Sequence, residues 1–560
     1  MQQKLKTITE ENFDKPKGFS TSSGSMANSE SELDSTDSKM GWSQSVNAFS
    51  ELVEKTFEPY DEEDNELLIN GICLAAGMAL EHDYLVGEDP TSAVNAFRFL
   101  IDKQLKAQIH HIIHHEDFRE MEGRWRGLKC LISSAKTGDT LKLKVLNVSK
   151  KEVQDSFNKY LNFEWDQSPL FKKLYEEEYG TAGGKPYACV IGDYYFDHRV
   201  EDVDWLKGMA KIAAAAHFIF IAGAAPALFN MDSWGELSDP RELTKILQTA
   251  EYIKWKGLRG TEESKYIALT MPRFLGRLPY SAKHNPVNGF DFDEDTSMPK
   301  PIHFSEMDTI ISPQIGHESR RNKNTLGYMN GNDSNNFVWI NSAYALGRNI
   351  CDAFAKYEWC TQIRGVEYGG KVDMLPQMSY GIDYYGQGTN LISTIETAMT
   401  DNREMELSKA GLIPLMYWSK TGFAVFLSSQ SLQAPKEYQD SAASINANLA
   451  ARLTYMFPVC RFAHYLKCIA RDKIGSFSSK EDISKYLNNW IKGYVVPDPN
   501  ASTDTKARCP LAEANVEIRD DESSPGYYNA TFYLKPHYQL EGLTVSLKLE
   551  SRLPIERGEL

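Results

Sequence analysis

The clearest pattern of apolar and polar residues lies near the end of the chain, from Asn515 to Pro554. Apolar residues alternate strictly with polar ones at Leu543, Val545, Leu547 and Leu549, and in the preceding stretch at Tyr528, Ala530, Phe532 and Leu534. A period of two predicts strands with one buried and one solvent-facing side. Strands at the end of a chain leave an edge that must be protected or that recruits a partner strand. An ordinary hairpin that closes its own domain fits the pattern equally well.

Helical periodicity dominates the region after the first 45 residues and returns near the C-terminus. Phe49, Leu52 and Val53 begin an apolar face at three- and four-residue spacing, and residues 91–128 continue as one long predicted helix. Two further helices are predicted at 453–474 and 478–490. The second opens on Ser478 followed by acidic residues, which is typical of a helix start.

Strand patterns occupy the middle of the chain. Residues 141–148 alternate like a strand, residues 187–191 have the pattern of a buried strand, and residues 423–427 form the clearest strand of a later block. Helices and strands alternate too irregularly for a doubly wound sheet. The predicted class is therefore α+β, with mixed sheets flanked by helices.

Length and composition divide the chain into four predicted regions. At about 150 residues per domain, 560 residues correspond to two to four domains. The tail at 1–45 is rich in serine and acids and has too few apolar residues to form a core, so it is predicted to be disordered. An N-terminal helical region at 46–140 follows, then a central α+β region at 141–440 and a C-terminal core domain at 441–560.

Charge and cysteine usage narrow the function classes. Acidic residues outnumber basic ones 77 to 61, giving a net charge of -16. This argues against a general nucleic-acid binder, which needs a basic surface to neutralise phosphates. The eight cysteines are scattered without a Cys-x-x-Cys pair, as expected of small apolar residues in a reducing compartment. No signal-peptide pattern is visible, so a cytoplasmic location is predicted.

One apolar run, residues 212–229, approaches the roughly 20 residues of a membrane-spanning helix. It is rich in alanine, contains His217 and is interrupted by Pro226. A buried helix or strand-loop in a large core is the expected structure, with no membrane insertion.

The run from His110 to His115 is the sharpest candidate for chemistry. His110 and His114, or His111 and His115, lie one helical turn apart and could chelate a transition metal. The acid, Glu116, follows the last histidine, and the spacing assigns no third ligand. Packing of a partly wet helix is the alternative interpretation, and neither a metal nor another cofactor is predicted.

Other motifs fall short of known catalytic patterns. Gly180–Pro186 resembles a phosphate-binding loop, but Tyr179 replaces a required glycine and Pro186 replaces the Ser or Thr that contacts magnesium. The acidic clusters lack the glycine-centred spacing of an EF-hand, and no Gly-x-Ser-x-Gly elbow occurs. The chain is not predicted to be an enzyme.

Several long phrases resemble the large subunit of the type VI secretion contractile sheath, the TssC/VipB family. They occur in order and span roughly residues 46 to 560. The phrases are Glu122–Leu128, Gly180–Tyr194, Pro272–Tyr280, Ala343–Arg348, Glu406–Pro414, Phe457–Cys468 and Leu534–Leu547. The Ser-rich tail and the Asn-rich stretch near residue 330 depart from the family's pattern and leave the subtype open.

The resemblance implies a mechanical function. A large sheath subunit pairs with a small one (TssB/VipA-like), and copies of the heterodimer stack helically on a baseplate around an inner tube (Hcp-like). Contraction drives the tube outward for effector delivery, and a ClpV-like AAA+ unfoldase recycles the contracted form in some members. Strands exchanged between protomers keep such a sheath connected. The candidate strand-pairing residues are Val516, Ile518, Tyr528, Ala530, Phe532, Leu534, Leu543, Val545, Leu547 and Leu549.

Two further contacts are expected on the same resemblance. The charged face of the 478–490 helix is a candidate for inner-tube contact through Lys480, Glu481, Asp482 and Lys485. The helix near residue 50 is a candidate for unfoldase docking through Phe49, Leu52 and Val53. Both helices could instead pack only on their own domains.

Two other function classes stay open at this point. One is a cytosolic metal-dependent hydrolase that uses the His110–His115 cluster, which stoichiometric zinc and loss of activity in His110→Ala would favour. The other is a soluble scaffold unrelated to sheaths, which a stable monomer without partners would favour.

Overall fold

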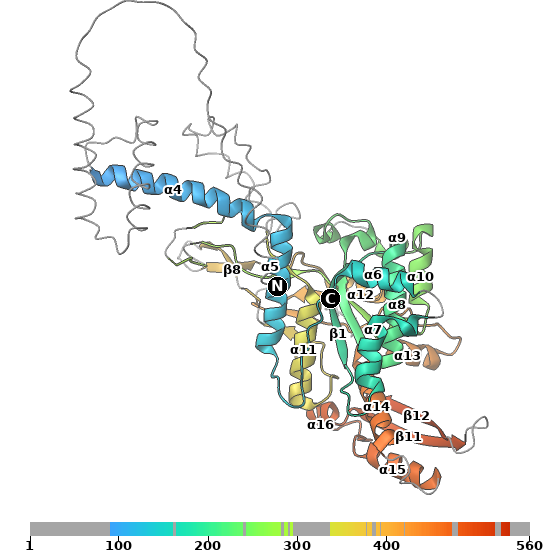
Figure 1. The fold of residues 1–560 in the computed structure, drawn as a ribbon. Helices are drawn as coiled ribbons and strands as arrows, with labels where there is room; N and C mark the ends of the chain where they lie inside the picture. Colours follow the sequence, from blue (N-terminus) through green and yellow to red (C-terminus); the bar gives the residue numbers. More distant parts are fainter. Residues whose placement is uncertain are drawn as a thin grey trace, which may run out of the picture. The chain divides into compact units, whose positions relative to one another are not determined.

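A computed structural model describes most of the chain after residue 89 (Figure 1). The described residues are 90–160, 164–238, 242–281, 285–288, 292–294, 337–373, 375–376, 378–382, 388–392, 394–418, 421–472, 480–520 and 528–537. The chain divides into two compact units, Met1–Leu105 and Lys106–Leu560. The account that follows concerns the second unit.

A six-stranded mixed sheet forms the centre of this unit. Its strands lie in the order β1 (Cys189–Phe196), β2 (Ile219–Ala224), β3 (Ile267–Met271), β9 (Leu412–Tyr417), β10 (Ala424–Phe426) and β6 (Lys371–Val372). The first four are parallel, whereas β10 runs antiparallel to both of its neighbours. Every residue of β2 is buried, as is typical of a parallel strand covered on both faces. The mixed sheet with its flanking helices confirms the α+β class.

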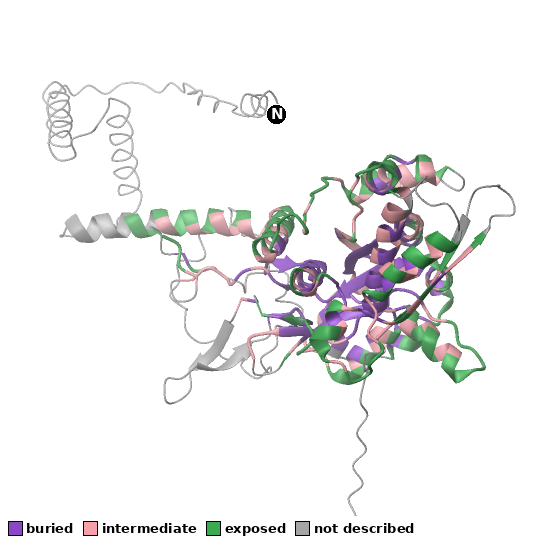
Figure 2. Cartoon of the chain, turned by 90° about the horizontal axis from the view of Figure 1, so that it is seen from below, coloured by how far each residue is buried: buried purple, intermediate pink, exposed green. Residues whose placement is uncertain are grey.

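Helices cover the sheet and supply most of the remaining core. α8 (Val200–Ala216) buries Trp205, Leu206 and Ile212 against it, and α11 (Ser342–Tyr357) contacts β1, β2 and β3. Figure 2 shows the buried residues gathered on the sheet and on the inner faces of these helices. The apolar run at 212–229 is therefore the end of α8, the strand β2 and a 3-10 turn, as expected of a buried segment. Among the described residues no helix is long and apolar enough to cross a membrane.

Two glycines bring α5 (Glu116–Ser134) close to its neighbours. A Cβ added at Gly123 would lie 2.4 Å from the carbonyl oxygen of Trp339, and one at Gly127 would lie 2.5 Å from the ring of Tyr344. Side chains at these positions would force the helix away from β5 (Trp339–Ile340) and α11. The sequence therefore places glycine where the backbone of α5 must approach the core.

The structure describes further elements outside the central sheet and the C-terminal part. They are α4 (Pro90–Ile113), α6 (Lys150–Lys159), η2 (Trp165–Gln167), α7 (Pro169–Phe171), the π-helix η3 (Lys172–Gly180), η4 (Pro226–Phe229), η5 (Trp234–Ser238), α9 (Leu243–Ile246), η6 (Ala250–Tyr252), α10 (Ile253–Arg259), η7 (Glu263–Tyr266), β4 (Phe274–Leu275), β7 (Met378–Ile382), β8 (Gly388–Ile392), α12 (Asp401–Lys409), α13 (Ser441–Ala450) and α16 (Thr503–Arg508).

The C-terminal part adds a second hydrophobic core. It consists of α14 (Leu453–Asp472), α15 (Lys480–Lys492) and a two-stranded antiparallel ribbon of β11 (Leu511–Asp520) and β12 (Tyr528–Pro536), which lie together in Figure 1. α14 belongs to both cores. Its first half, from Leu453 to Cys460, packs in the central core, and its second half places Phe462 and Leu466 in the C-terminal core.

Two sequence predictions of local structure are wrong. The helix predicted over 91–128 is interrupted at His114 and His115, because the chain turns there and α5 starts anew with Glu116 and Asp117 in its first turn. Acidic residues favour a new helix N-terminus at that point. The strand predicted over 141–148 has no partner strand among the described residues, so alternation alone does not produce a paired strand there.

Candidate functional site

The C-terminal ribbon carries several of the predicted strand-pairing residues. Val516 is 2% exposed, and Ile518, Phe532 and Leu534 pack beside it against the C-terminal core. Their side chains therefore serve this chain's own fold. Ala530 is exposed, and Tyr528 is the first residue of β12. Leu543, Val545, Leu547 and Leu549 lie outside the described residues.

One edge of the ribbon is occupied by a side chain of α15. The amide of Asn488 donates to the carbonyl oxygen of Val516 at 2.9 Å, and its oxygen accepts from the N–H of Val516 at 3.1 Å. This pair of bonds reproduces what a neighbouring strand would offer. The outer edge of β11 is thus blocked at its centre.

The outer edge of β12 is open in the described part of the chain. Since both main-chain groups of Val516 are bound to Asn488, Val516 and its partner Phe532 form a non-hydrogen-bonded pair. Such pairs alternate along an antiparallel ribbon, so Ile518 with Ala530 and Ala514 with Leu534 are of the same kind. The main-chain groups of Ala530, Phe532 and Leu534 therefore point to the outer edge, where no described strand pairs with them.

The α15 helix exposes the charged face that the sequence predicts. Leu487 and Ile491 are buried in the C-terminal core, with Trp490 packed beside them. Glu481, Asp482 and Lys485 are exposed. Lys480 is the first residue of the helix. The helix therefore packs on its own domain and still presents a charged surface.

Buried polar contacts join α14 to the central core. His464 is 2% exposed, and its Nε2 lies 2.9 Å from the carbonyl oxygen of Ala216 at the end of α8. A carbonyl only accepts, so Nε2 carries the hydrogen. Two turns further, the guanidinium of Arg471 donates to the carbonyl oxygens of Tyr179, Gly180 and Thr181 at the end of the π-helix η3. These contacts fix α14 as a rigid link between the two cores.

Burial lowers the pKa of His464 to about 4, so acidification should weaken the fold through this residue. The unfolded imidazole titrates near its ordinary value of 6.5. Stability supplied by the neutral ring is therefore complete above pH 6.5 and is lost as the pH falls toward 4, by about 3 kcal/mol in total. Urea unfolding at several pH values should show this loss, and His464→Gln should flatten the profile between pH 6.5 and 4. Equal slopes in the two proteins would contradict this role.

The histidine run does not assemble a metal site in the described residues. His110 stacks on His114 at 5.7 Å and packs at a tilt against Phe292 at 4.9 Å between ring centroids. His114 Nε2 lies 3.7 Å from Glu294 Oε1, and burial lowers the pKa of this histidine. Across the ranges described, no three His, Cys, Asp or Glu residues are grouped to hold an ion. No observation favours the hydrolase alternative.

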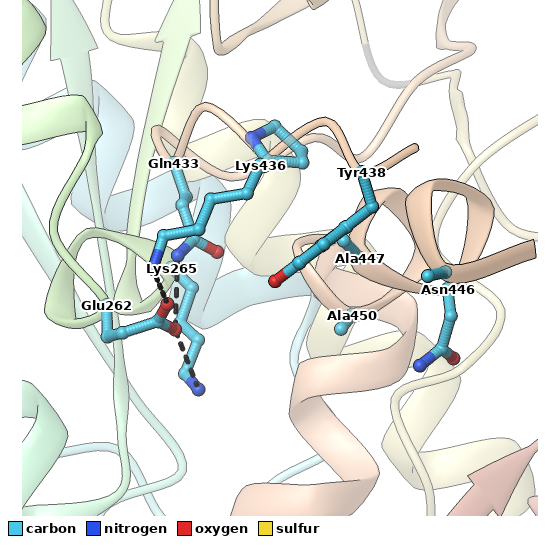
Figure 3. Close-up of a pocket in the computed structure, with 10 residues that line it drawn as sticks. Glu262, Lys265, Gln433, Lys436, Tyr438, Asn446, Ala447 and Ala450 are labelled. Atoms are coloured by element: carbon cyan, nitrogen blue, oxygen red, sulfur yellow. Dashed lines mark hydrogen bonds and ion pairs between the residues drawn. The ribbon is translucent and has the colours of Figure 1, made fainter. Parts of the chain in front are cut away.

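A small pocket lies between η7 and α13 (Figure 3). Its charged groups contact one another, since Glu262 lies 3.6 Å from Lys436, 4.0 Å from Lys265 and 3.3 Å from Gln433. Tyr438 and the alanines of α13 form the opposite wall. The arrangement contains no nucleophile with an adjacent base.

The cysteines have the environment of small apolar residues. Cys351, Cys360 and Cys460 are buried and free. Burial raises the pKa of the Cys351 thiol to about 11 and that of Cys360 to about 12. Both thiols therefore stay protonated and poorly reactive near neutral pH.

Sequence reasoning did not identify Asn488 or the double role of α14. Asn488 stands between Leu487 and Trp490, both of which contact the C-terminal core. A polar side chain in that position was the available signal, because a half-buried amide beside the core needs hydrogen-bond partners.

Comparisons with known proteins agree with one another. Residues 98–308 and 316–433 match the family described as EvpB/VC_A0108, tail sheath N-terminal domain, and residues 442–553 match the tail sheath gpW/gp25-like domain of the same group. The type VI secretion system sheath protein TssC1 of Pseudomonas aeruginosa is 46% identical over 512 residues, covering 91% of this chain and 96% of the relative.

A structural likeness is weaker. A chain in the cryo-EM structure of the anti-feeding prophage (AFP) baseplate aligns with 74% of this chain and 84% of its own length, at a TM-score of 0.34 and 9% identity. That likeness is too low to bear on the fold. The family matches and the TssC1 relative are sufficient: the chain belongs to the VipB family of tail sheath proteins and is a sheath protein of the type VI secretion system.

Proposed function

We propose that this chain is the large subunit of a contractile sheath that assembles by strand addition at β12. It pairs with a small sheath subunit of the TssB/VipA type, and copies of the pair form a helical polymer in the cytoplasm. The observation that carries the proposal is the asymmetry of the ribbon. Asn488 occupies the edge of β11, while the main-chain groups of Ala530, Phe532 and Leu534 on β12 pair with no strand that the structure describes.

Strand addition suits a sheath that changes shape. Main-chain hydrogen bonds hold a neighbour firmly, whereas the segments that flank the added strand absorb rotation between protomers. The bridging helix α14 then carries a displacement of the ribbon to the central core, since it belongs to both. We propose that such displacements add up to a contraction that drives an inner tube outward for effector delivery.

The proposal is tested by co-expressing the chain with the small sheath subunit and imaging the product by negative-stain electron microscopy. Long hollow tubules are expected. A stable heterodimer without polymer under all conditions would reject the sheath assembly, and a stable monomer that binds no small subunit would reject the pairing as well.

We further propose that α15 contacts the inner tube, an Hcp-like protein. Reversing Lys480 and Lys485 to Glu should weaken co-purification of the tube with the sheath. Each exposed ion pair supplies only about 0.5 kcal/mol, but the loss is repeated in every protomer of the polymer. The same charge change at Lys151 and Lys207, which are exposed on α6 and α8, serves as the control. Unchanged co-purification in both variants would leave α15 as a packing helix only.

We also propose two further partners, an unfoldase and a baseplate. Phe49, Leu52 and Val53, outside the described residues, are proposed to dock a ClpV-like unfoldase. A baseplate is proposed to nucleate the polymer. The first is tested by binding of a peptide spanning residues 45–59 to the unfoldase N-terminal domain, with Leu52→Asp as the variant that should not bind.

A further inference from the structure

A straight segment follows α5 without joining any sheet. Residues 141–149 contain no turn, bend or paired strand. Leu141, Leu143 and Val148 pack against the central core, whereas Val145 and Leu146 are 68% and 48% exposed. The segment is anchored near its two ends, and its middle is exposed.

The main-chain donors and acceptors of residues 142–147 have no hydrogen-bond partner in the described structure. Within the described part of the structure, no N–H or C=O group of residues 142–147 makes a main-chain hydrogen bond, and no side chain bonds to one. The nearest bonds lie at the ends, where the Leu141 carbonyl accepts from Gly138 and the Val148 carbonyl accepts from the Tyr194 hydroxyl. A run of exposed, unpaired donors and acceptors is a template for another strand.

The segment is also locally basic. Lys144 pairs with Glu178, and the main-chain N–H of Lys185 donates to the same carboxylate. Lys142 and Lys185 are both exposed, and Lys185 lowers the pKa of Lys142. These lysines form a locally basic stretch on a chain whose net charge is -16. Like charges held together in this way are relieved by an anionic partner.

We propose that residues 141–147 pair with an extended, acidic segment of a neighbouring chain in the assembled sheath. This inference rests on the proposed sheath assembly and adds a second strand-pairing site to it, separate from the β12 edge. The added strand would bond to every second residue of 142–147, and its acidic side chains would lie among Lys142, Lys144 and Lys185. Val145 and Leu146 would be covered at the same time.

The pairing accounts for a conflict between sequence and structure. Residues 141–148 have the alternation of a strand, yet no strand in the described part of the chain pairs with them. A strand signal without an internal partner is what an intermolecular sheet requires.

Hydrogen exchange in the purified chain and in sheath tubules tests the site. Every second amide of residues 142–147, where the N–H points toward the added strand, should exchange on the order of 100-fold more slowly in tubules. The exposed loop at 136–140 is the internal control and should change little. Tubules visible by microscopy with unchanged exchange at 142–147 would overturn this inference and leave the proposed function intact. Failure to form tubules would reject the proposed function, and this inference with it.

Variants then separate the contributions of main chain and charge. Successive N–H groups of an extended chain point to opposite sides, so only one of Val145→Pro and Leu146→Pro should abolish the protection. Neither should change the melting temperature of the isolated chain, because neither N–H has an internal partner. Lys142→Glu with Lys185→Glu should remove the protection, and Lys142→Gln with Lys185→Gln should retain part of it. Full protection in the Glu variant would refute an acidic partner.

Discussion

Ala530→Pro should leave the isolated chain folded and abolish sheath tubules. Ala530 is exposed on β12, and its N–H points to the outer edge rather than to β11. Proline is tolerated on an edge strand whose N–H faces solvent, but it removes a donor that an added strand needs. Thermal unfolding of the purified variant should resemble that of the parent chain. Electron microscopy after co-expression with the small subunit should show no tubules.

The neighbouring position provides a matched control. Thr531 pairs with Glu517 across the ribbon in a hydrogen-bonded pair, so Thr531→Pro removes a bond inside the chain. That variant should lose about 1–2 kcal/mol of stability even without partners. Ala530→Val, which keeps the N–H, should still form tubules. Normal tubules in Ala530→Pro would show that the sheath does not assemble through this edge.

The periodicity of the sequence predicts elements well where local contacts decide them. α14, α15 and β10 lie where apolar spacing places them, since each buries a continuous apolar face. The break between α4 and α5 was not predictable in this way, because the periodic pattern continues through His114 and His115. There the rings of His110 and His114 pack against residues 292–294, which are distant in sequence.

The same distinction applies to the candidate strand-pairing surface: local alternation predicts part of it, and a contact distant in sequence determines the rest. Alternation in residues 528–535 indicates which side chains face the core, and the structure places Phe532 and Leu534 there. Which edge stays open depends instead on Asn488, which lies 28 residues before Val516. No pattern within a strand reports a hydrogen bond from a helix elsewhere in the chain. The open edge of β12 is therefore a property of the fold and not of the strand sequence.

Arg277→Ala should lower the free energy of unfolding by about 3–5 kcal/mol. The side chain of Arg277 is 5% exposed and bonds to Glu122 at 2.8 Å and to Glu294 at 2.5 Å. Removing the cation leaves two carboxylates without their shared partner, one of them 2% exposed. Since Glu122 belongs to α5 and Glu294 to a distant segment, the loss should also loosen the contact between them. Urea unfolding monitored by tryptophan fluorescence measures the change.

Arg126→Ala is the matched control for Arg277→Ala, because Arg126 contacts the same oxygen of Glu122. Its Nε lies 2.7 Å from Glu122 Oε1, yet its side chain is 34% exposed. An ion pair in contact with water supplies only about 0–1 kcal/mol, so Arg126→Ala should cost far less than Arg277→Ala. The loss in the free energy of unfolding would then depend on how deeply each arginine is buried and not on its contact with Glu122. Equal losses in the two variants would show that Glu294 contributes nothing, and that the buried pair does not hold α5 in place.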